Sequence, residues 1–284
     1  MNLAELRNLY RRELNNSSIK ESDYMLNILL EEYFNLDFTF ISLNPSYKLE
    51  EYQIKKILKS LKSLKNNFPI DYLINKRLFL NNEFYINEDV LIPRPETEEL
   101  VDWIIQDNIE IKEKKRVIDI GTGSGCIAIT LSLYNKYFET IGVDISKKAL
   151  DVCEINKKKF SSQVTFLEYN IMEEKSFSEK FDIIISNPPY LTKNEVSTIG
   201  KNVQFEPKIA LFAPLDDPLL FYKKIINFSM INLNNGGLIY FEINPIYIKE
   251  IKQILAKNNL NDVNFRDDFR GNKRFLKIVL NERN

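Results

Sequence analysis

Four consecutive residues, Asn187, Pro188, Pro189 and Tyr190, have the chemistry of a loop that binds an amide or an amine. They directly follow the apolar run 181–186, which reads as a buried strand, and open α/β sheets bind their ligands where strands end. The prolines donate no N–H and hold the residues before them extended, which leaves a stiff edge of carbonyl oxygens beside the Asn187 side chain and the Tyr190 ring. Such an edge suits a planar NH2 group, as in a carboxamide or a nucleobase. A proline-rich turn that merely ends a strand is the plain alternative, but the whole tetrapeptide after a buried strand favours the binding loop.

A second group of residues has the chemistry of a nucleotide site. Residues 121–125, Gly-Thr-Gly-Ser-Gly, follow an apolar strand and open a helix, so that backbone N–H groups can approach a ligand closely. Asp144 ends the next strand, where a carboxylate can accept hydrogen bonds from ribose hydroxyls. Asp119, just before the loop, can orient the loop or face a cationic group. The spacing Gly-x-Gly-x-Gly, with Cys126 at the place of a third small residue, departs from the dinucleotide fingerprint but leaves a dinucleotide open.

Together the two groups predict a methyl transfer. A nucleoside-bearing methyl donor would lie along the first and second strands and an NH2 acceptor at the fourth, because the first and fourth strands are neighbours in the usual doubly wound order. An amide nitrogen is a poor nucleophile, since its lone pair is delocalised. Asn187 Oδ1 and the Pro188 carbonyl can each accept one N–H, which turns the lone pair toward the methyl group and stabilises the charge that develops on nitrogen. Such a reaction needs positioning more than it needs a base.

Composition excludes several other chemistries. The chain of 284 residues contains no histidine, so zinc sites built on Cys and His and a histidine general base are excluded, and we expect no metal. The 39 basic and 40 acidic residues nearly cancel, so bulk charge does not favour direct binding to nucleic acid. Cys126 and Cys153 fit small core residues in a reducing compartment. Without a leader or an apolar run of spanning length, we expect a cytoplasmic protein with no membrane association.

The elements that must position these residues begin after a helical segment. Apolar stripes at helical spacing predict three helices before about residue 70, the second of them capped by Ser22. The stripes are Leu3, Leu6, Leu9, Tyr10 and Leu14, then Tyr24, Ile28, Leu29 and Tyr33, then Ile54, Ile57, Leu58, Leu61 and Leu64. A bundle that packs on itself explains them, and it could also recognise a partner.

A hairpin follows the helices, with strands at 77–80 and 83–86 around Asn81-Asn82, a pair that tolerates the positive φ of a tight turn. We therefore divide the chain into a helical domain for partner recognition at 1–75, a bridging hairpin at 76–92 and a catalytic domain at 93–284.

From residue 116 onward strands and helices alternate, which is typical of a parallel, doubly wound sheet. Strands are predicted at 116–120, 139–143, 163–167, 181–186 and 237–243, with helices near 125–135, 147–159, 216–233 and 246–257. Residues 263–265 and 274–280 are expected to form a terminal antiparallel pair.

Several motifs, taken in order, resemble one known family. They are residues 91–98, Leu-Ile-Pro-Arg-Pro-Glu-Thr-Glu; 119–125, Asp-Ile-Gly-Thr-Gly-Ser-Gly; 144–150, Asp-Ile-Ser-Lys-Lys-Ala-Leu; 186–190, Ser-Asn-Pro-Pro-Tyr; and Glu206-Pro207 followed by Ala210-Leu211. Together they are similar to the peptide chain release factor glutamine-N(5) methyltransferases. Asn-Pro-Pro-Tyr alone is shared with N-methyltransferases that act on DNA adenine and ribosomal RNA guanine, whereas the segment around Arg94 behind a helical domain is more specific.

The resemblance implies a fold, a cofactor and a substrate. The fold is the class I S-adenosylmethionine-dependent methyltransferase fold, α/β and Rossmann-like, with a mostly parallel seven-stranded sheet and a small N-terminal helical domain. The enzyme would use S-adenosyl-L-methionine, yield S-adenosyl-L-homocysteine, and methylate the glutamine of the Gly-Gly-Gln motif in class 1 release factors, a protein methylation of translation termination. The release factor would be its partner, and we expect a monomer.

The resemblance also implies site residues. Cofactor-binding residues would be Gly121, Thr122, Gly123, Ser124, Gly125, Asp144, Asn187 and, toward the adenine, Ile171. Catalytic residues would be Asn187, Pro188 and Tyr190, and the substrate would meet Asn187, Pro188, Pro189, Tyr190 and Glu206.

Two residue pairs depart from the family pattern, and two single residues have more than one interpretation. The family often carries Asp and an aromatic residue where Asn170-Ile171 stands, and a Gly and later a Gln where Asn244-Pro245 follows the fifth strand. Arg94 either pairs with Glu96 or Glu98 at a helix start or serves a ligand loop. Trp103 is expected in the core.

Other functions are compatible with parts of the pattern. The same site could methylate a glutamine of a ribosomal protein, or the adenine or guanine of a nucleic acid, which would need a basic path lined by aromatic residues. An NAD-dependent dehydrogenase would use the glycine loop and make Asn187–Tyr190 incidental.

Overall fold

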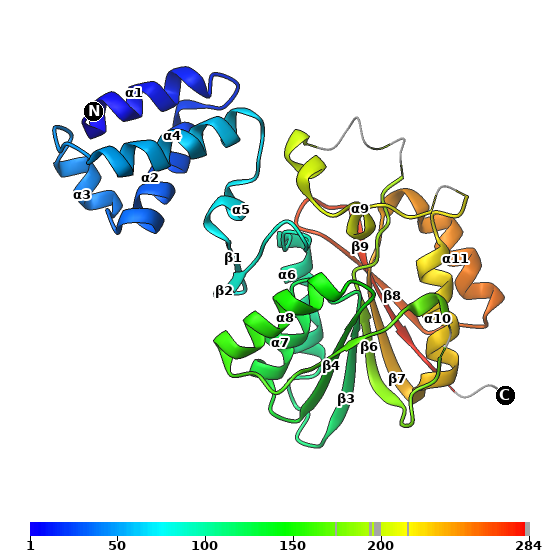
Figure 1. Cartoon of the computed structure of the whole chain (residues 1–284). Helices are drawn as coiled ribbons and strands as arrows, with labels where there is room; N and C mark the ends of the chain where they lie inside the picture. Colours follow the sequence, from blue (N-terminus) through cyan, green and yellow to red (C-terminus); the bar gives the residue numbers. More distant parts are fainter. Residues whose placement is uncertain (174, 193–194, 196–199, 215, 282–284) are drawn as a thin grey trace. The chain divides into compact units, whose positions relative to one another are not determined.

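The computed structural model describes residues 1–173, 175–192, 195, 200–214 and 216–281 (Figure 1). The chain separates into two units. The first consists of Met1–Asn75 together with Gly200–Phe205, and the second of Lys76–Ile199 together with Glu206–Asn284.

The first unit is helical. Its helices are α1 (Leu3–Glu13), α2 (Ile19–Phe34), α3 (Phe38–Leu43), α4 (Glu51–Lys65) and α5 (Ile70–Ile74), and the 3-10 helix η3 (Lys201–Phe205) belongs to the same unit. The long helices bury one apolar side each, and the core that they share includes Leu6, Tyr10, Leu30, Ile57 and Leu61. The three predicted stripes therefore became α1, α2 and α4, while α3 and α5 are too short for their periodicity to be recognised.

The start of α2 differs from the prediction. Ser18, not Ser22, caps the helix: its side chain accepts a hydrogen bond from the Glu21 backbone N–H, and the Glu21 carboxylate accepts one from the Ser18 backbone N–H. This reciprocal pair is a capping box, a stronger start signal than a lone serine. The buried face of α2 includes Leu26, Leu29 and Leu30, and Tyr24 lies off that face and is 61% exposed instead of lying in the core.

The second unit opens with the hairpin β1 (Lys76–Phe79) and β2 (Asn82–Tyr85). Its turn residues are Leu80 and Asn81, with φ of 44° and 64°, so the predicted turn at Asn81-Asn82 was one residue too late. The register Phe79↔Asn82 turns Phe79 and Phe84 into the core, and this burial decides the position of the turn over the preference of Leu80 for negative φ.

The main sheet has seven strands in the order β5-β4-β3-β6-β7-β9-β8. The strands are β3 (Lys115–Ile120), β4 (Phe138–Asp144), β5 (Thr165–Glu168), β6 (Phe181–Ser186), β7 (Leu233–Glu242), β8 (Val263–Asp267) and β9 (Lys273–Val279). All neighbouring pairs from β5 to β7 are parallel, and β9 runs antiparallel to both β7 and β8. The predicted mostly parallel, doubly wound sheet with a terminal antiparallel pair is confirmed.

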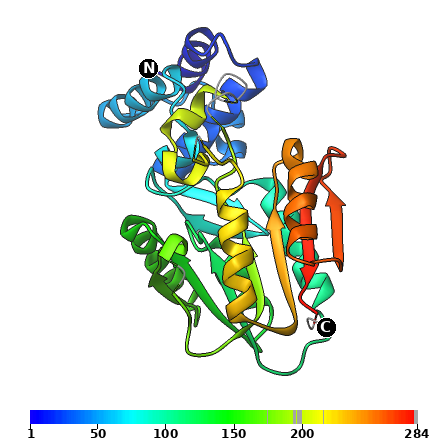
Figure 2. The same ribbon diagram turned by 90° about the vertical axis from the view of Figure 1, so that its right-hand side faces the viewer.

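Helices cover both faces of this sheet. On one face α6 (Pro95–Asp107) and α7 (Cys126–Tyr134) share a core with strand residues such as Val117 and Ile185, and α8 (Lys147–Phe160) lies against β4 and β5. On the other face α10 (Leu220–Asn232) and α11 (Ile248–Lys257) pack on Ile184 and Ile239. Figure 1 shows the two groups on opposite sides of the sheet, and Figure 2 shows α10, in yellow, running alongside the strands. The short helices η1 (Ile171–Glu173), α9 (Lys208–Leu211) and η4 (Pro245–Tyr247) lie in the connecting segments.

Three expectations about single residues are confirmed by burial. Cys126 and Cys153 are free and buried, and Trp103 is buried with its ring edge-on to Tyr240, at 5.7 Å between ring centroids. Among the helices within the described residues, none is both long enough and apolar enough to cross a bilayer.

Candidate active site

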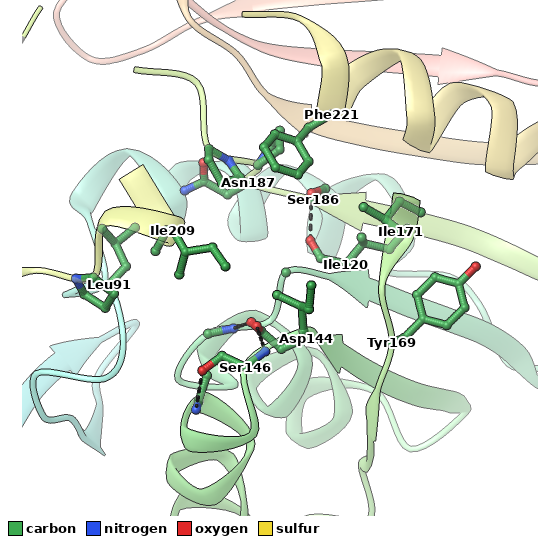
Figure 3. A pocket seen from close by; sticks show the side chains of 18 of the residues that line it. Leu91, Ile120, Asp144, Ser146, Tyr169, Ile171, Ser186, Asn187, Ile209 and Phe221 are labelled. Carbon is green, nitrogen blue, oxygen red and sulfur yellow. Dashed lines mark hydrogen bonds between the residues drawn. The ribbon is translucent and has the colours of Figure 1, made fainter. Parts of the chain in front are cut away.

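A pocket opens at the carboxyl ends of β3, β4, β5 and β6, where a doubly wound sheet is expected to bind its ligand (Figure 3). It contains about 990 Å³ of space, part of it open to solvent. Asp144 and Asn187 face each other across it, Tyr169 and Ile171 lie on one side, and Leu91 and Ile209 lie on the other.

The glycine loop after β3 forms one wall of the pocket. Gly121 and Gly123 line it, with φ of 77° and 55°, values that only glycine adopts freely. A Cβ on either residue would meet no heavy atom within 4 Å, so the backbone there faces open space. Gly125, with φ of 79°, instead caps α7 and would bring a Cβ to 3.0 Å from the Phe166 ring. Two glycines therefore serve the pocket and one serves the helix.

Asp144 ties the end of β4 to that loop. One carboxylate oxygen, Oδ2, accepts the Gly123 N–H at 3.0 Å, and Oδ1 accepts the Ser146 N–H at 2.9 Å. Burial raises the pKa of Asp144 while these backbone bonds act in the opposite direction. Each oxygen keeps a further lone pair, so the carboxylate can accept hydroxyl donors from a ligand in the pocket.

Asp119 lies beneath the loop and orients it. It is fully buried at the end of β3 and accepts the Thr122 hydroxyl at 2.6 Å. Burial raises its pKa to about 7, against a usual value near 3.8. Of the two roles left open by the sequence, the contact with Thr122 favours orientation of the loop over contact with a cationic group.

The acceptor loop, which we define as residues 187–190, follows β6, the strand directly beside β3. The register pairs Ile118 with Ile184 and Asp119 with Ile185, so the first and fourth strands of the catalytic unit are neighbours as predicted. The buried Ser186 hydroxyl donates to the Ile120 carbonyl at 2.7 Å and joins the two strand ends. Ser186, Asn187, Pro188 and Pro189 all line the pocket.

Asn187 is held by a network that the sequence did not reveal. Its Nδ2 donates to Thr97 Oγ1 at 3.1 Å, Thr97 Oγ1 donates to Glu242 Oε2 at 2.7 Å, and the Tyr190 hydroxyl donates to Glu242 Oε1 at 2.9 Å. We call these four residues the orientation network. They come from the first turn of α6, the end of β7 and the loop after β6.

The centre of the orientation network is buried. Thr97 is 3% exposed and Glu242 is 1% exposed. Burial raises the pKa of Glu242, while the hydroxyls of Thr97 and Tyr190 and the nearby guanidinium of Arg274 favour its charged form. Burial, and next the charge of Glu242, raises the pKa of Tyr190 well above its usual range, so the tyrosine stays a proton donor.

Glu206 lies outside the pocket lining and has another partner. Its side chain is fully buried and accepts from the Arg94 guanidinium at 2.6 Å and from the Ile92 N–H at 3.2 Å. Arg94 therefore pairs with Glu206 and not with Glu96 or Glu98. Arg94 comes shortly after residues 89–91, and Glu206 comes directly before the segment with Pro207, Ile209 and Ala210. The ion pair therefore links two stretches of chain that line the pocket. Glu206 is thus placed to shape the pocket wall, and its contact with the substrate stays a prediction.

The two departures from the family pattern have local explanations. Asn170 and Ile171 both line the pocket after β5, and the Asn170 side chain accepts the Met172 N–H at 3.0 Å to start η1. Asn244 caps η4 through the Ile246 N–H, with Pro245 at the first helical position, and its Nδ2 reaches the Tyr190 carbonyl at 3.4 Å. Asn-Pro thus starts the short helix that leads into α11.

The residues named from the sequence divide into two groups. Those that line the pocket are Gly121, Gly123, Asp144, Ile171, Asn187, Pro188 and Pro189. Those that lie behind the lining are Thr122, Ser124, Gly125, Tyr190 and Glu206. Thr97 and Glu242 were missed as site residues. Thr97 belongs to the quoted motif 91–98, but nothing in the sequence shows that a strand end 145 positions later meets it.

Known proteins resemble this chain both in sequence and in fold. Residues 101–204 match the Methyltransferase small domain family. The release factor glutamine methyltransferase of Flavobacterium psychrophilum is 41% identical over 262 residues, which cover 91% of this chain and 92% of that protein. The protein of the same name from Bacteroides thetaiotaomicron is 39% identical over 215 residues, covering 75% and 76%.

Solved structures support the fold alone. The hMettl16 catalytic domain, in complex with a MAT2A 3′UTR hairpin, matches with a TM-score of 0.56 and 16% identity over 85% of this chain and 86% of that one. A Thermus thermophilus 16S rRNA N2 methyltransferase, in complex with AdoMet and guanosine, matches with a TM-score of 0.54 and 16% identity over 73% and 50%. The seven-stranded sheet is therefore that of a class I methyltransferase. The Flavobacterium psychrophilum relative is 41% identical over nearly the whole of both chains, and this protein therefore belongs to the release factor glutamine methyltransferase family.

Proposed function

We propose that this enzyme methylates the side-chain amide nitrogen of the glutamine in the Gly-Gly-Gln motif of class 1 peptide chain release factors, with S-adenosyl-L-methionine as the methyl donor. The observation that carries the proposal is the pairing of a glycine loop with an acceptor-rich loop on adjacent strand ends, in a chain of this family. The products would be N5-methylglutamine, S-adenosyl-L-homocysteine and a proton.

The pocket fits the donor. Gly121 and Gly123 leave open space where side chains would stand, and Asp144 has lone pairs for the ribose hydroxyls. Ile171 and Tyr169 provide an apolar side for the adenine. When bound there, S-adenosylmethionine supplies an electrophilic methyl group on a sulfonium.

The acceptor loop positions the amide of the substrate glutamine. Asn187 Oδ1 and the Pro188 carbonyl each take one N–H of the glutamine amide, which fixes the plane of the amide and directs the nitrogen lone pair into the pocket. The same two oxygens stabilise the positive charge that develops on nitrogen. Pro189 contributes stiffness, because its ring fixes the backbone that presents the Pro188 carbonyl. Tyr190, bound to Glu242, holds the far end of the loop.

In this proposal the helical unit recognises the release factor. Its exposed apolar side chains include Tyr24, Phe38, Leu43 and Tyr52, which a protein surface can cover. In the same proposal the enzyme works as a monomer without nucleic acid, in the cytoplasm, where translation terminates.

The test is transfer of a labelled methyl group from S-adenosylmethionine to candidate substrates. We expect label in a class 1 release factor and none in the variant whose tip glutamine is replaced by alanine. Ribosomal proteins, DNA and RNA serve as parallel acceptors. Label in one of these and none in the release factor would refute the proposal.

A further inference from the structure

An asparagine at the acceptor position raises a problem of orientation. Its side chain ends in two branches of nearly equal size, an oxygen that accepts and an NH2 group that donates. The proposed function needs the oxygen toward the substrate amide. A flipped Asn187 would present its own N–H groups to the N–H groups of the substrate, and the amide could not be held.

The hydrogen bonds of the orientation network decide between the two orientations. An ionised Glu242 carboxylate can only accept, and its two oxygens face the hydroxyls of Thr97 and Tyr190, so the single hydroxyl proton of Thr97 goes to Oε2, at 2.7 Å. Thr97 Oγ1 can then only accept, and its partner at 3.1 Å on Asn187 must be the NH2 branch. This leaves Oδ1 as the branch available to a ligand of the pocket.

The second carboxylate oxygen is occupied as well. The Tyr190 hydroxyl donates to Oε1 at 2.9 Å, and the Tyr222 hydroxyl donates to the Glu242 backbone carbonyl at 3.1 Å. The Arg274 guanidinium lies 5.9 Å from the centre of the Tyr190 ring and favours the charged form of Glu242. Both carboxylate oxygens are therefore engaged and the strand end is fixed, which holds Glu242 in place beside Thr97.

We propose that Thr97 and Glu242 are positioning residues that fix the orientation of the Asn187 amide, and that they thereby make the pocket select a carboxamide over a carboxylate. This inference rests on the proposed function, because it assigns Asn187 Oδ1 to the substrate. A carboxylate side chain has no N–H to offer Oδ1 or the Pro188 carbonyl, so a glutamate at the same place would be rejected.

A structural role alone would predict something different. If the network only joined α6 to β7, then its loss would lower stability without changing which side chain the pocket prefers. The test therefore measures kcat, KM, cofactor affinity and the preference between two release factors, one with the natural tip glutamine and one with glutamate there.

Thr97→Val removes the acceptor for Asn187 at nearly equal volume, and Thr97→Ser keeps it. We expect kcat to fall about 10- to 100-fold in Thr97→Val, with the Kd for S-adenosylmethionine within about twofold of wild type, and to recover in Thr97→Ser. Thr130→Val is the matched control, because Thr130 is a buried threonine of α7 whose hydroxyl has no partner among the described residues. It should leave kcat unchanged.

Glu242→Gln tests orientation directly. A glutamine can donate an N–H to Thr97, which frees the threonine hydroxyl to donate to Asn187 and allows the asparagine to turn its NH2 group to the pocket. We expect kcat to fall and the affinity for the glutamate-tipped factor, relative to the glutamine-tipped one, to rise about tenfold or more.

The outcomes separate the two proposals. If wild-type enzyme fails to label the glutamine-tipped factor, then the proposed function is wrong. If wild type labels it while folded Thr97→Val and Glu242→Gln retain wild-type kcat, or lose kcat without any change in the preference between the two tips, then the orientation role is wrong. Should Glu242→Gln not fold, the Thr97 pair still decides: equal kcat values in Thr97→Val and Thr97→Ser would overturn the inference.

Discussion

Single residues on the two sides of the pocket have separable tasks. In the proposed function Asp144 belongs to the donor side, where it binds the Gly123 and Ser146 N–H groups, and Asn187 belongs to the acceptor side, where it binds Thr97. This separation predicts different kinetic defects for variants of the two residues.

We expect Asn187→Ala to lower kcat by about 100-fold or more, because it removes one of two acceptors that align the substrate and stabilise its charge. Asp144→Ala should chiefly weaken the donor, with a Kd for S-adenosylmethionine raised about tenfold or more from loss of its hydroxyl contacts. Labelled-methyl kinetics and calorimetric titration measure the two quantities. Equal loss of donor affinity in both variants would contradict the separation.

Asp119 should make stability depend on pH. Its pKa is raised from 3.8 to about 7, first by burial and also by the charge of Asp144, and Cys126 and Cys153 are the neighbouring thiols. As pH rises from about 4 to about 7, the unfolded chain releases this proton while the folded chain keeps it, so the free energy of unfolding falls. Above about pH 7 the fall is complete.

Asp119→Asn removes this titration, so the decline between pH 4 and 7 should be smaller than in wild type. Urea unfolding at several pH values checks it, with Asp144→Asn as the control for the neighbouring carboxylate. Parallel pH profiles for wild type and Asp119→Asn would show that Asp119 is not the group responsible.

At the scale of elements, the Arg94–Glu206 pair joins the segment before α6 to the segment before α9. Because the Glu206 side chain is fully buried, Arg94→Met should remove the cation that faces a buried carboxylate and lower the free energy of unfolding by about 3 kcal/mol. Adding Glu206→Gln removes the charge and should restore part of the loss. Urea unfolding of both single variants and the double variant tests this, and single losses below about 1 kcal/mol would contradict it.

The sequence predicted most elements of the sheet because their signals are local. Strand 181–186 is a continuous apolar run and appears with those bounds. By contrast β7 begins at Leu233, four residues before the predicted 237. Leu233 pairs with Phe181 ahead of a bulge in the strand, and the intervening Asn234, Asn235 and two glycines give no local signal of a strand.

The candidate site was predictable to the extent that its residues follow strand ends. Gly121, Gly123, Asp144 and Asn187 meet at one pocket because parallel strands end at the same edge. The partners of Glu206 and Asn187 were not predictable, since Arg94 and Thr97 are 112 and 90 positions away along the chain. Such pairs depend on tertiary packing, which no local pattern encodes.

At the scale of the whole molecule, substrate binding should use more than the pocket. If the helical unit binds the release factor, then changing its exposed apolar residues should raise KM for the protein substrate alone. We expect Tyr52→Ser combined with Leu43→Ser to raise KM for the release factor about tenfold, with kcat and cofactor affinity unchanged.

A short peptide that contains Gly-Gly-Gln is the internal control, because it can reach the pocket without the helical unit. Its slow methylation should be the same in wild type and in the variant. An unchanged KM for the intact factor would argue against partner recognition by these residues.

The row of acceptors at Pro188 and Pro189 also has a consequence for turnover. In the proposed function a primary amide brings two N–H groups to Asn187 Oδ1 and the Pro188 carbonyl, but the methylated product has only one. The prolines have no N–H to replace the missing donor. One buried acceptor then loses its partner at a cost of about 1–3 kcal/mol, so the product binds roughly 5- to 150-fold more weakly than the substrate. If the loop aligns the substrate as proposed, we therefore expect it also to favour release of the product and to end the reaction after a single methyl group.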